Sequence, residues 1–442
     1  MNDTPRAADT VIDAGWIIPV EPSGVVLHEH SLVLHQGVIV DIVPTRDSAR
    51  YQAAERHALR EHVLIPGLIN LHTHAAMALM RGIADEAPSS AGFDPFAWPA
   101  QMGTTSANFV RDGALHACAE MLRAGITCFN DMYFFPDATA QAALQAGMRA
   151  VLGIFAIESA SPYGSDAADC MTRGLAIRDA LRDEPLLSFS MATDVAHSIS
   201  NESLERMAIY AAELDLPVHI HLHETQNEIR ECVSKHGQRP LQRVESAGLL
   251  GPSLIAVHAI HLTPVEIELL AQHGCHVAHC PVSNLKLAHG IAPVRALLEQ
   301  HLNIGLGTEN AASNHRMDIL SEMRLAALLA KGTTGDATAL PARQAREMAT
   351  LGGARALGLE TRIGSLKPGK RADVVAIDLH ALELTPRYDL HSHLVYAAGR
   401  EHVTHVWIDG RLRVEQRRLL SLDEAELRSK ATYWQDHLCR LH

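Results

Sequence analysis

Residues 64–74 run Leu64-Ile65-Pro66-Gly67-Leu68-Ile69-Asn70-Leu71-His72-Thr73-His74 and place two histidines directly after a short apolar run. The apolar part predicts a buried strand. Side chains two residues apart on a strand point to the same side, so His72 and His74 face a common point. Neutral imidazole is the commonest protein ligand for zinc and related metals. Because the chain has 28 His and repeats the His-x-His pattern elsewhere, this pair alone is weak evidence for a metal site.

The composition is that of an ordinary globular protein. The chain has 442 residues, of which 47% are hydrophobic and 20% charged, and its formal charge is 38 − 51 = −13. A chain of this length can bury a large core and still include a smaller second domain. The acidic excess argues against nucleic acid as a partner. The seven Cys form no Cys-x-x-Cys pair, which indicates free thiols in a reducing compartment.

Neither a secretory signal nor a membrane segment is recognisable in the sequence. The first residues, Met1–Arg6, begin no apolar stretch, and no apolar run approaches the roughly 18 residues that a membrane helix needs. We therefore expect a cytoplasmic protein with a small-molecule substrate, no membrane partner and a homo-oligomeric state.

From about Val63 onward, short apolar runs alternate with segments of helical period, as in βα units. The predicted strands number eight: Val63–His74, Ile126–Met132, Arg149–Ile157, Leu186–Asp194, Pro217–Thr225, Leu254–Ile260, His276–Pro281 and Asn303–Asn310. The clearest predicted helices are Ser106–Ala124, Asn201–Leu214, Pro264–His273 and Asp318–Lys331. Ser106 is suited to cap its helix and Gly125 to end it. Eight strand–helix repeats in this length predict a TIM-like (β/α)8 barrel.

Both ends of the chain show strand patterns without intervening helices. The predicted strands there are Thr10–Val20, Ser31–Leu34, Gly37–Val43, Ile363–Leu366, Ala372–Asp378 and His402–Gly410. Because the termini of a domain often lie close together, the two ends are expected to form one small β-sandwich domain. The predicted division assigns residues 1–62 plus 363–442 to this domain and residues 63–362 to the barrel.

Polar side chains gather at the predicted carboxyl ends of the barrel strands, where active sites of this fold lie. They are His72 and His74 on strand one, His219, His221, His223 and Glu224 on strand five, His258 and His261 on strand six, and Glu309 on strand eight. Taken singly, each could be a satisfied core histidine or a surface group. Several buried imidazoles and a carboxylate at one mouth need a partner, and a divalent metal with an open position provides it.

Five segments resemble the amidohydrolase superfamily: Pro66–His74, His221-Leu222-His223-Glu224-Thr225, Ala256-Val257-His258, His279–Leu287 and Gly305-Leu306-Gly307-Thr308. Within the superfamily, the chain is similar to the 5-methylthioadenosine/S-adenosylhomocysteine deaminases, which are close to the hydrolases and deaminases that act on s-triazines. The resemblance covers essentially the whole chain, and its motifs are more specific for the superfamily than for one substrate.

The resemblance implies a role for each residue of the site. His72, His74 and His221 would bind one divalent metal, Zn²⁺ first and Fe²⁺ as the alternative, and Glu309 would bind the metal and act as the base. Glu224 would shuttle protons, and His258 would polarise the tetrahedral intermediate. A bound metal lowers the pKa of water from 15.7 toward about 7. The implied reaction is hydrolytic deamination of an adenosine-type purine.

The sequence departs from this family at four positions of the expected pocket. The family has Gly-Thr-Asp-Gly where this chain has Gly307-Thr308-Glu309-Asn310, and it has a substrate-contacting His where this chain has Asp194. A family Trp aligns with Gly92, and a carboxylate that grips the ribose aligns with Gln101.

Trp98, Gln101, Asp194 and His197 are therefore the predicted substrate-binding residues. Asp194 favours a cationic or donor-rich ligand, or pairs with a neighbouring His and raises its pKa. Two alternatives stay open. One is hydrolysis of another substrate, such as an s-triazine, amide, ester or phosphotriester. The other is a weakly active or non-catalytic metal or ligand binder.

Overall fold

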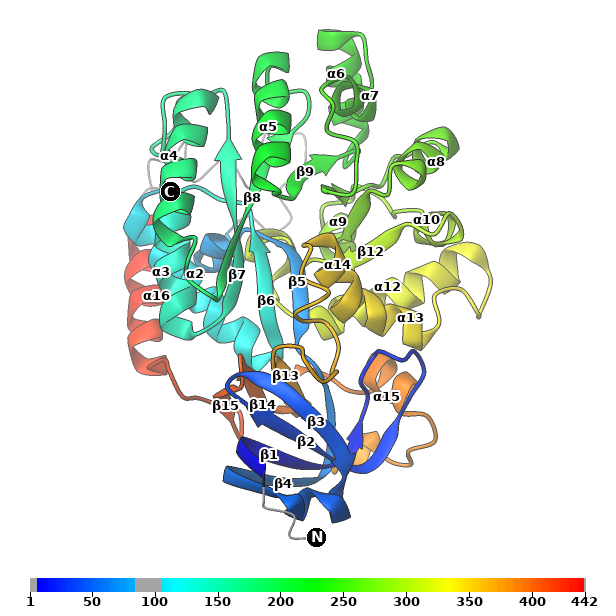
Figure 1. Cartoon of the computed structure of the whole chain (residues 1–442). Helices are drawn as coiled ribbons and strands as arrows, with labels where there is room; N and C mark the ends of the chain where they lie inside the picture. The colour runs from blue at the N-terminus through cyan, green and yellow to red at the C-terminus, as the bar shows by residue number, and fades with distance from the viewer. Residues whose placement is uncertain (1–5, 84–104, 441–442) are drawn as a thin grey trace.

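Two eight-stranded sheets organise the chain in the computed structural model, which describes residues 6–83 and 105–440 (Figure 1). The first sheet is parallel, and its strands follow one another in chain order. They are β5 (Leu68–Thr73), β6 (Ile126–Asp131), β7 (Arg149–Ala156), β8 (Leu187–Val195), β9 (Val218–Leu222), β10 (Leu254–His258), β11 (His276–His279) and β12 (Asn303–Leu306). Each coincides with one predicted strand, so the predicted TIM-like barrel is confirmed.

The barrel closes where β5 meets the segment after β12. The backbone N–H groups of Thr308 and Glu309 donate to the carbonyl of His72 at 3.0 and 3.1 Å. Next to this contact, the amide of Asn70 donates to the hydroxyl of Thr308 at 2.8 Å and accepts from its backbone N–H at 3.0 Å. Short polar bonds thus hold the seam together, and the seam brings His72, His74 and Glu309 to one place.

Helices surround this barrel, and most begin at a side-chain cap. Ser106 accepts from the backbone of Phe109 at the start of α2 (Ala107–Arg123), as predicted. The other helices are α3 (Pro136–Ala146), α4 (Ala167–Leu181), α5 (Asn201–Leu214), α6 (Gln226–His236), α7 (Pro240–Ser246), α8 (Pro264–Gln272), α9 (Pro281–Lys286), α10 (Val294–Glu299), α11 (Ala311–Asn314), α12 (Ile319–Thr334), α13 (Ala342–Glu347) and α14 (Gly353–Ala356). None of the described helices is both long and apolar enough to cross a bilayer.

The second sheet combines strands from both ends of the chain, as the sequence predicted, and they form one continuous mixed sheet (Figure 1). Its order is β16 (Arg418–Leu419), β15 (Arg411–Glu415), β14 (Val403–Ile408), β13 (Val374–Asp378), β4 (Tyr51–Pro66), β1 (Arg6–Ile17), β2 (Leu27–His35) and β3 (Val38–Pro44). The two ends meet where β4 pairs antiparallel with β13, with Val375 opposite Ile65.

Three details differ from the sequence prediction. Ile363–Leu366 is not a strand. The predicted first barrel strand divides at Gly67, because its first residues belong to β4 of the second sheet. A side chain at Gly67 would collide with Thr127, so the chain can pass between the two sheets only with glycine there. The third difference is the C-terminal helix α16 (Glu424–Cys439), which lies in the range assigned to the β-sandwich domain but packs against α2 of the barrel. Its Trp434 Nε1 donates to Asp112 at 3.1 Å.

A buried ion pair connects the two sheets. Arg149 at the start of β7 donates to both oxygens of Asp373, just before β13, at 3.0 and 3.2 Å. Both side chains are 2% exposed. Asp373 also accepts from the backbone N–H of Asp409 at 2.9 Å. The two sheets are therefore bound through a fully desolvated contact, while the division into domains at residues 62 and 363 stays a prediction.

Candidate metal centre

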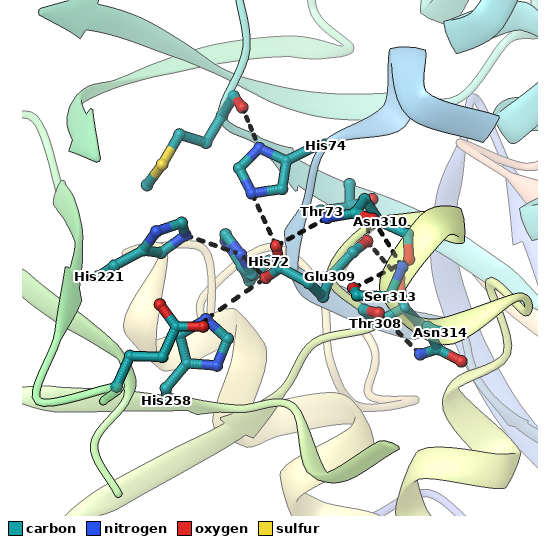
Figure 2. Close-up of polar contacts among 12 residues, drawn as sticks. His72, Thr73, His74, His221, His258, Thr308, Glu309, Asn310, Ser313 and Asn314 are labelled. Carbon is teal, nitrogen blue, oxygen red and sulfur yellow. Dashed lines mark hydrogen bonds and ion pairs between the residues drawn. The ribbon is translucent and has the colours of Figure 1, made fainter. Parts of the chain in front are cut away.

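Four side chains that the sequence predicted as metal ligands converge at the closure seam. His72 and His74 come from the end of β5, His221 from β9, and Glu309 from the turn after β12 (Figure 2). One donor atom of each lies within 4.8 Å of the others, and all four residues are buried. The Nε2 atoms of His72 and His221 are 3.2 Å apart, and Glu309 Oε1 lies 3.0 Å from His74 Nε2. Glu309 Oε2 also contacts His72.

The opposite ring nitrogens of these imidazoles are engaged by other protein groups. This arrangement fixes the orientation of each ring and is usual for metal-binding histidines. The Nδ1 partners are His219 for His72 (2.9 Å), the carbonyl of Met132 for His74, Asp194 for His221 (3.0 Å) and Asn284 for the adjacent His258 (2.8 Å). As a result, every Nε2 atom faces the same point (Figure 2).

The donor set fits a divalent cation. Asp194 contacts His221 Nδ1, so the other ring nitrogen, Nε2, is the atom directed at a metal, and it lies 3.2 Å from His72 Nε2. Ligand atoms about 2.1 Å from a tetrahedral zinc lie about 3.4 Å apart, which agrees with this spacing. Three imidazoles and a carboxylate are also the ligand types of zinc and iron sites.

The electrostatics of the centre follow from burial and from its carboxylates. Burial lowers the pKa of His72 to about 3. Burial also lowers that of His221, but the hydrogen bond to Asp194 and the charge of Glu309 outweigh it and raise the pKa to about 9. Burial would raise the pKa of Glu309, yet His72 and His74 hold it well below its usual range. Glu309 is therefore a carboxylate, the form that binds metal.

Backbone geometry aims two of the side chains. Glu309 and His258 have φ angles of 60° and 69°, in the left-handed region that non-glycine residues seldom adopt. Such conformations cost about 1–3 kcal/mol and cluster at functional sites. Thr73 Oγ1 donates to the carbonyl of Glu309 at 2.9 Å, and Asn310 Nδ2 donates to Glu309 Oε1 at 3.0 Å. Where the resembling family has Asp-Gly, this chain has Glu309-Asn310. The longer Glu309 carboxylate is therefore accompanied by the Asn310 amide, which hydrogen-bonds to it.

A second carboxylate lies beside the cluster. Glu224 Oε1 is 3.5 Å from His258 Nε2 and 2.9 Å from His289 Nδ1. His258 Nε2 is also 3.5 Å from Glu309 Oε2 and has no hydrogen-bond partner among the described residues. Burial raises the pKa of Glu224, but His258 and His289 lower it to about 2. The three predicted catalytic residues, Glu224, His258 and Glu309, therefore lie together.

Two histidines of this centre received no role from the sequence. His219 was noted on strand five, but its contact with His72 depends on the curvature of the barrel. His289 lies in the loop after α9, about 65 residues from Glu224, and no spacing in the sequence connects the two.

The predicted substrate contacts are only partly brought to the centre. Asp194 at the end of β8 pairs with His221, which was the second of the two possibilities that the sequence left open. His197 instead faces Glu231 of α6, with His197 Nε2 3.1 Å from Glu231 Oε2. Trp98 and Gln101, like Gly92, lie outside the described residues.

Known proteins resemble this chain in both sequence and fold. A profile of the amidohydrolase family matches residues 63–413. The chain belongs to the amidohydrolase family. Among curated members, a 5-methylthioadenosine/S-adenosylhomocysteine deaminase of Saccharophagus degradans is 43% identical over 435 residues, which cover 98% of this chain and 97% of that protein.

Solved structures agree with the assignment. An adenosine deaminase from Xanthomonas campestris with bound zinc has a TM-score of 0.96 at 43% identity and covers 99% of this amidohydrolase and 100% of its own chain. The zinc-bound atrazine chlorohydrolase of Arthrobacter aurescens has a TM-score of 0.87 at 22% identity and covers 96% and 99% of the two chains. At 22% identity this likeness is evidence for a shared fold only. Family membership and the buried His/Glu cluster together identify a centre for a divalent metal.

Proposed function

We propose that this amidohydrolase catalyses the hydrolytic deamination of an adenosine-type purine, with 5-methylthioadenosine and S-adenosylhomocysteine as first candidates. The observation that supports it is the position of Glu224, 3.5 Å from His258 and within 4.8 Å of a ring nitrogen of His221, which places a proton carrier beside the proposed metal site. The curated relative named for these substrates supports the choice of substrate class. The reaction exchanges the ring amino group and water for a ring carbonyl and ammonia.

In this proposal, His72, His74, His221 and Glu309 hold the metal. Zinc is the first candidate, because the zinc-bound adenosine deaminase superposes on nearly the whole chain, and Fe²⁺ is the alternative. When bound, the metal acidifies water and so supplies a nucleophile at neutral pH.

The protein groups move the protons. Glu309, 3.5 Å from His258, accepts a proton from the attacking water through its Oε2 atom. Glu224, ionised at the start, receives that proton and donates it to the ring nitrogen next to the attacked carbon. It then takes the second proton of the water from the tetrahedral intermediate and passes it to the departing amino group, which leaves as ammonia, so both carboxylates end as they began. His258 directs Nε2 between Glu224 and Glu309. There it can stabilise negative charge on the oxygen that water adds to the ring carbon.

The test is an ammonia-release assay on purified protein reloaded with Zn²⁺ or Fe²⁺. We expect turnover of 5-methylthioadenosine and S-adenosylhomocysteine, and loss of both bound metal and activity in His72→Ala. The panel also includes an s-triazine, an ester and a phosphotriester. Turnover of one of these beside inactivity on every purine would overturn the proposal and favour a pocket diverged toward another substrate. Metal binding without any turnover would instead indicate a non-catalytic binder.

A further inference from the structure

A recess on the side of the barrel has arginine as the commonest residue of its lining. It lies among α2, α16, the turn between β15 and β16, and the short 3-10 helix η6 (Arg400–His402), and it encloses about 340 Å³. Figure 1 shows α16 running beside α2 above the edge of the second sheet. Among the residues that the structure describes, its lining includes five arginines: Arg81, Arg123, Arg400, Arg417 and Arg428. None of them belongs to the metal centre.

The positive charge in this recess exceeds the negative charge. Its five arginines are opposed by Glu120 and Glu424, so the formal balance is 5 − 2 = +3 with His116 neutral. Each carboxylate is shared by two guanidinium groups. Arg400 donates to Glu120 at 2.8 Å and Arg81 also contacts it, while Arg123 and Arg428 lie 3.3 and 3.1 Å from Glu424.

Like charges at this density oppose one another. Burial first, and then the charges of Arg123 and Arg400, lower the pKa of Arg417, although the nearby charge of Glu401 opposes this. A protein with an overall charge of −13 therefore holds a local positive excess in a concave site, where low-dielectric walls concentrate the field. An anion of matching charge would relieve this repulsion.

The backbone at Arg417 holds this guanidinium in a defined position. Gln416 and Arg417 form the two-residue turn between β15 and β16, with φ angles of 46° and 66°. Such turns favour Asn-Gly, because both positions need positive φ. Strained residues of this kind concentrate at ligand sites. The Arg417 side chain is held by the carbonyls of Arg400 at 2.6 Å and Val403 at 3.1 Å, which fix its direction.

We propose that this recess binds the pyrophosphate group of an organic phosphate, at a site separate from the metal centre. Arginine forks recognise phosphate oxygens in pairs. Pyrophosphate near neutral pH has a charge of about −3, equal and opposite to the excess in the recess. The volume lies in the range of small-molecule sites, about 300–1,000 Å³. The remaining lining includes Ala119, Leu419 and Leu427, which offer an apolar surface to the organic part.

The experiment is isothermal titration calorimetry of the full-length protein with sodium pyrophosphate and with cytidine diphosphate, whose pyrimidine is not an adenosine-type base. The test variant is the double substitution Arg123→Gln/Arg428→Gln, and both side chains are more than a third exposed. The matched control, Arg173→Gln/Arg206→Gln, removes the same charge from exposed pairs on α4 and α5. We expect wild-type binding that weakens with salt and a loss of about tenfold or more in the test variant alone.

Tighter binding of cytidine diphosphate than of pyrophosphate would support an organic ligand, and equal binding would assign the site to inorganic pyrophosphate. A wild-type protein that binds neither probe would overturn the proposal. Equal losses in the two double variants would also overturn it, because they would show a nonspecific charge effect. Binding that persists in the test variant would place the anion at another site, such as the metal centre, and would likewise refute the recess.

Discussion

Replacing Asp194 by asparagine removes one negative charge and almost no volume. The Asp194 carboxylate accepts from His221 Nδ1 at 3.0 Å, and Glu309 also faces this imidazole from the ligand cluster. A carboxylate behind a metal-binding histidine orients the ring and strengthens it as a ligand. The asparagine amide would still accept a hydrogen bond, but it would not stabilise the positive charge that His221 gains on binding a cation.

Loss of such a partner typically weakens metal affinity by about 10- to 100-fold. That range corresponds to about 1.4–2.7 kcal/mol. Because the Asp194 side chain is 23% exposed, water screens part of its charge, and we expect Asp194→Asn near the lower end. Asp194→Ala removes the hydrogen bond as well and should weaken binding further.

The assay is competition for Zn²⁺ between the purified apoprotein and a chromophoric chelator. Asp215→Asn is the matched control, since Asp215 is exposed and lies just before the strand that contains His221. An Asp194→Asn protein with unchanged zinc affinity but a raised KM would refute the reasoning. That outcome would return Asp194 to the role of substrate contact.

Three further predictions concern other parts of the molecule. Replacing His289 by leucine should lower kcat about 10- to 100-fold with little change in KM, because Glu224 loses its 2.9 Å contact with the imidazole. His289→Asn should recover most of the loss, and equal kcat in the wild type and both variants would contradict this. Asp373→Ala should lower the free energy of unfolding by about 3 kcal/mol in urea, because buried Arg149 loses its two-oxygen partner and keeps only the Asp409 carboxylate at 3.5 Å as a counter-charge. A loss below about 1 kcal/mol would contradict this. Burial raises the pKa of Glu322 from 4.5 to about 8, so between these pH values Glu322 is ionised only in the unfolded chain, and stability falls as pH rises. Glu322→Gln should therefore reduce the fall in melting temperature from about pH 5 to 8. Melting temperatures that fall equally steeply in the variant and the wild type would refute this prediction.

The amino-acid sequence was sufficient to predict the barrel and most of the metal centre. Local patterns were enough, because strand runs and helix caps such as Ser106 depend on near neighbours in the chain. The closeness of the proposed ligands followed as well. In a closed parallel barrel the carboxyl ends of all strands lie at one mouth, so His72, His221 and Glu309 had to be neighbours once the fold was known.

Where local patterns were ambiguous, the sequence prediction failed. Ile363–Leu366 has the composition of a strand but finds no partner strand. The run beginning at Val63 was correctly apolar, yet its first residues pair with β13 rather than with the barrel. Strand propensity describes a residue that fits a pleated, half-buried surface, and only tertiary pairing decides which surface that is.

The partners of the proposed ligands became apparent only in the folded molecule. Asp194, His219 and His289 contact His221, His72 and Glu224 through side chains that meet across the barrel mouth, at positions set by strand register and loop path. The arginine recess is a similar case, since its charges come from three distant parts of the chain. Sequence patterns record periodicity along the chain, whereas hydrogen bonds and charges act through space over a few ångströms. The residues that tune this centre were therefore visible in the sequence, but their roles were not.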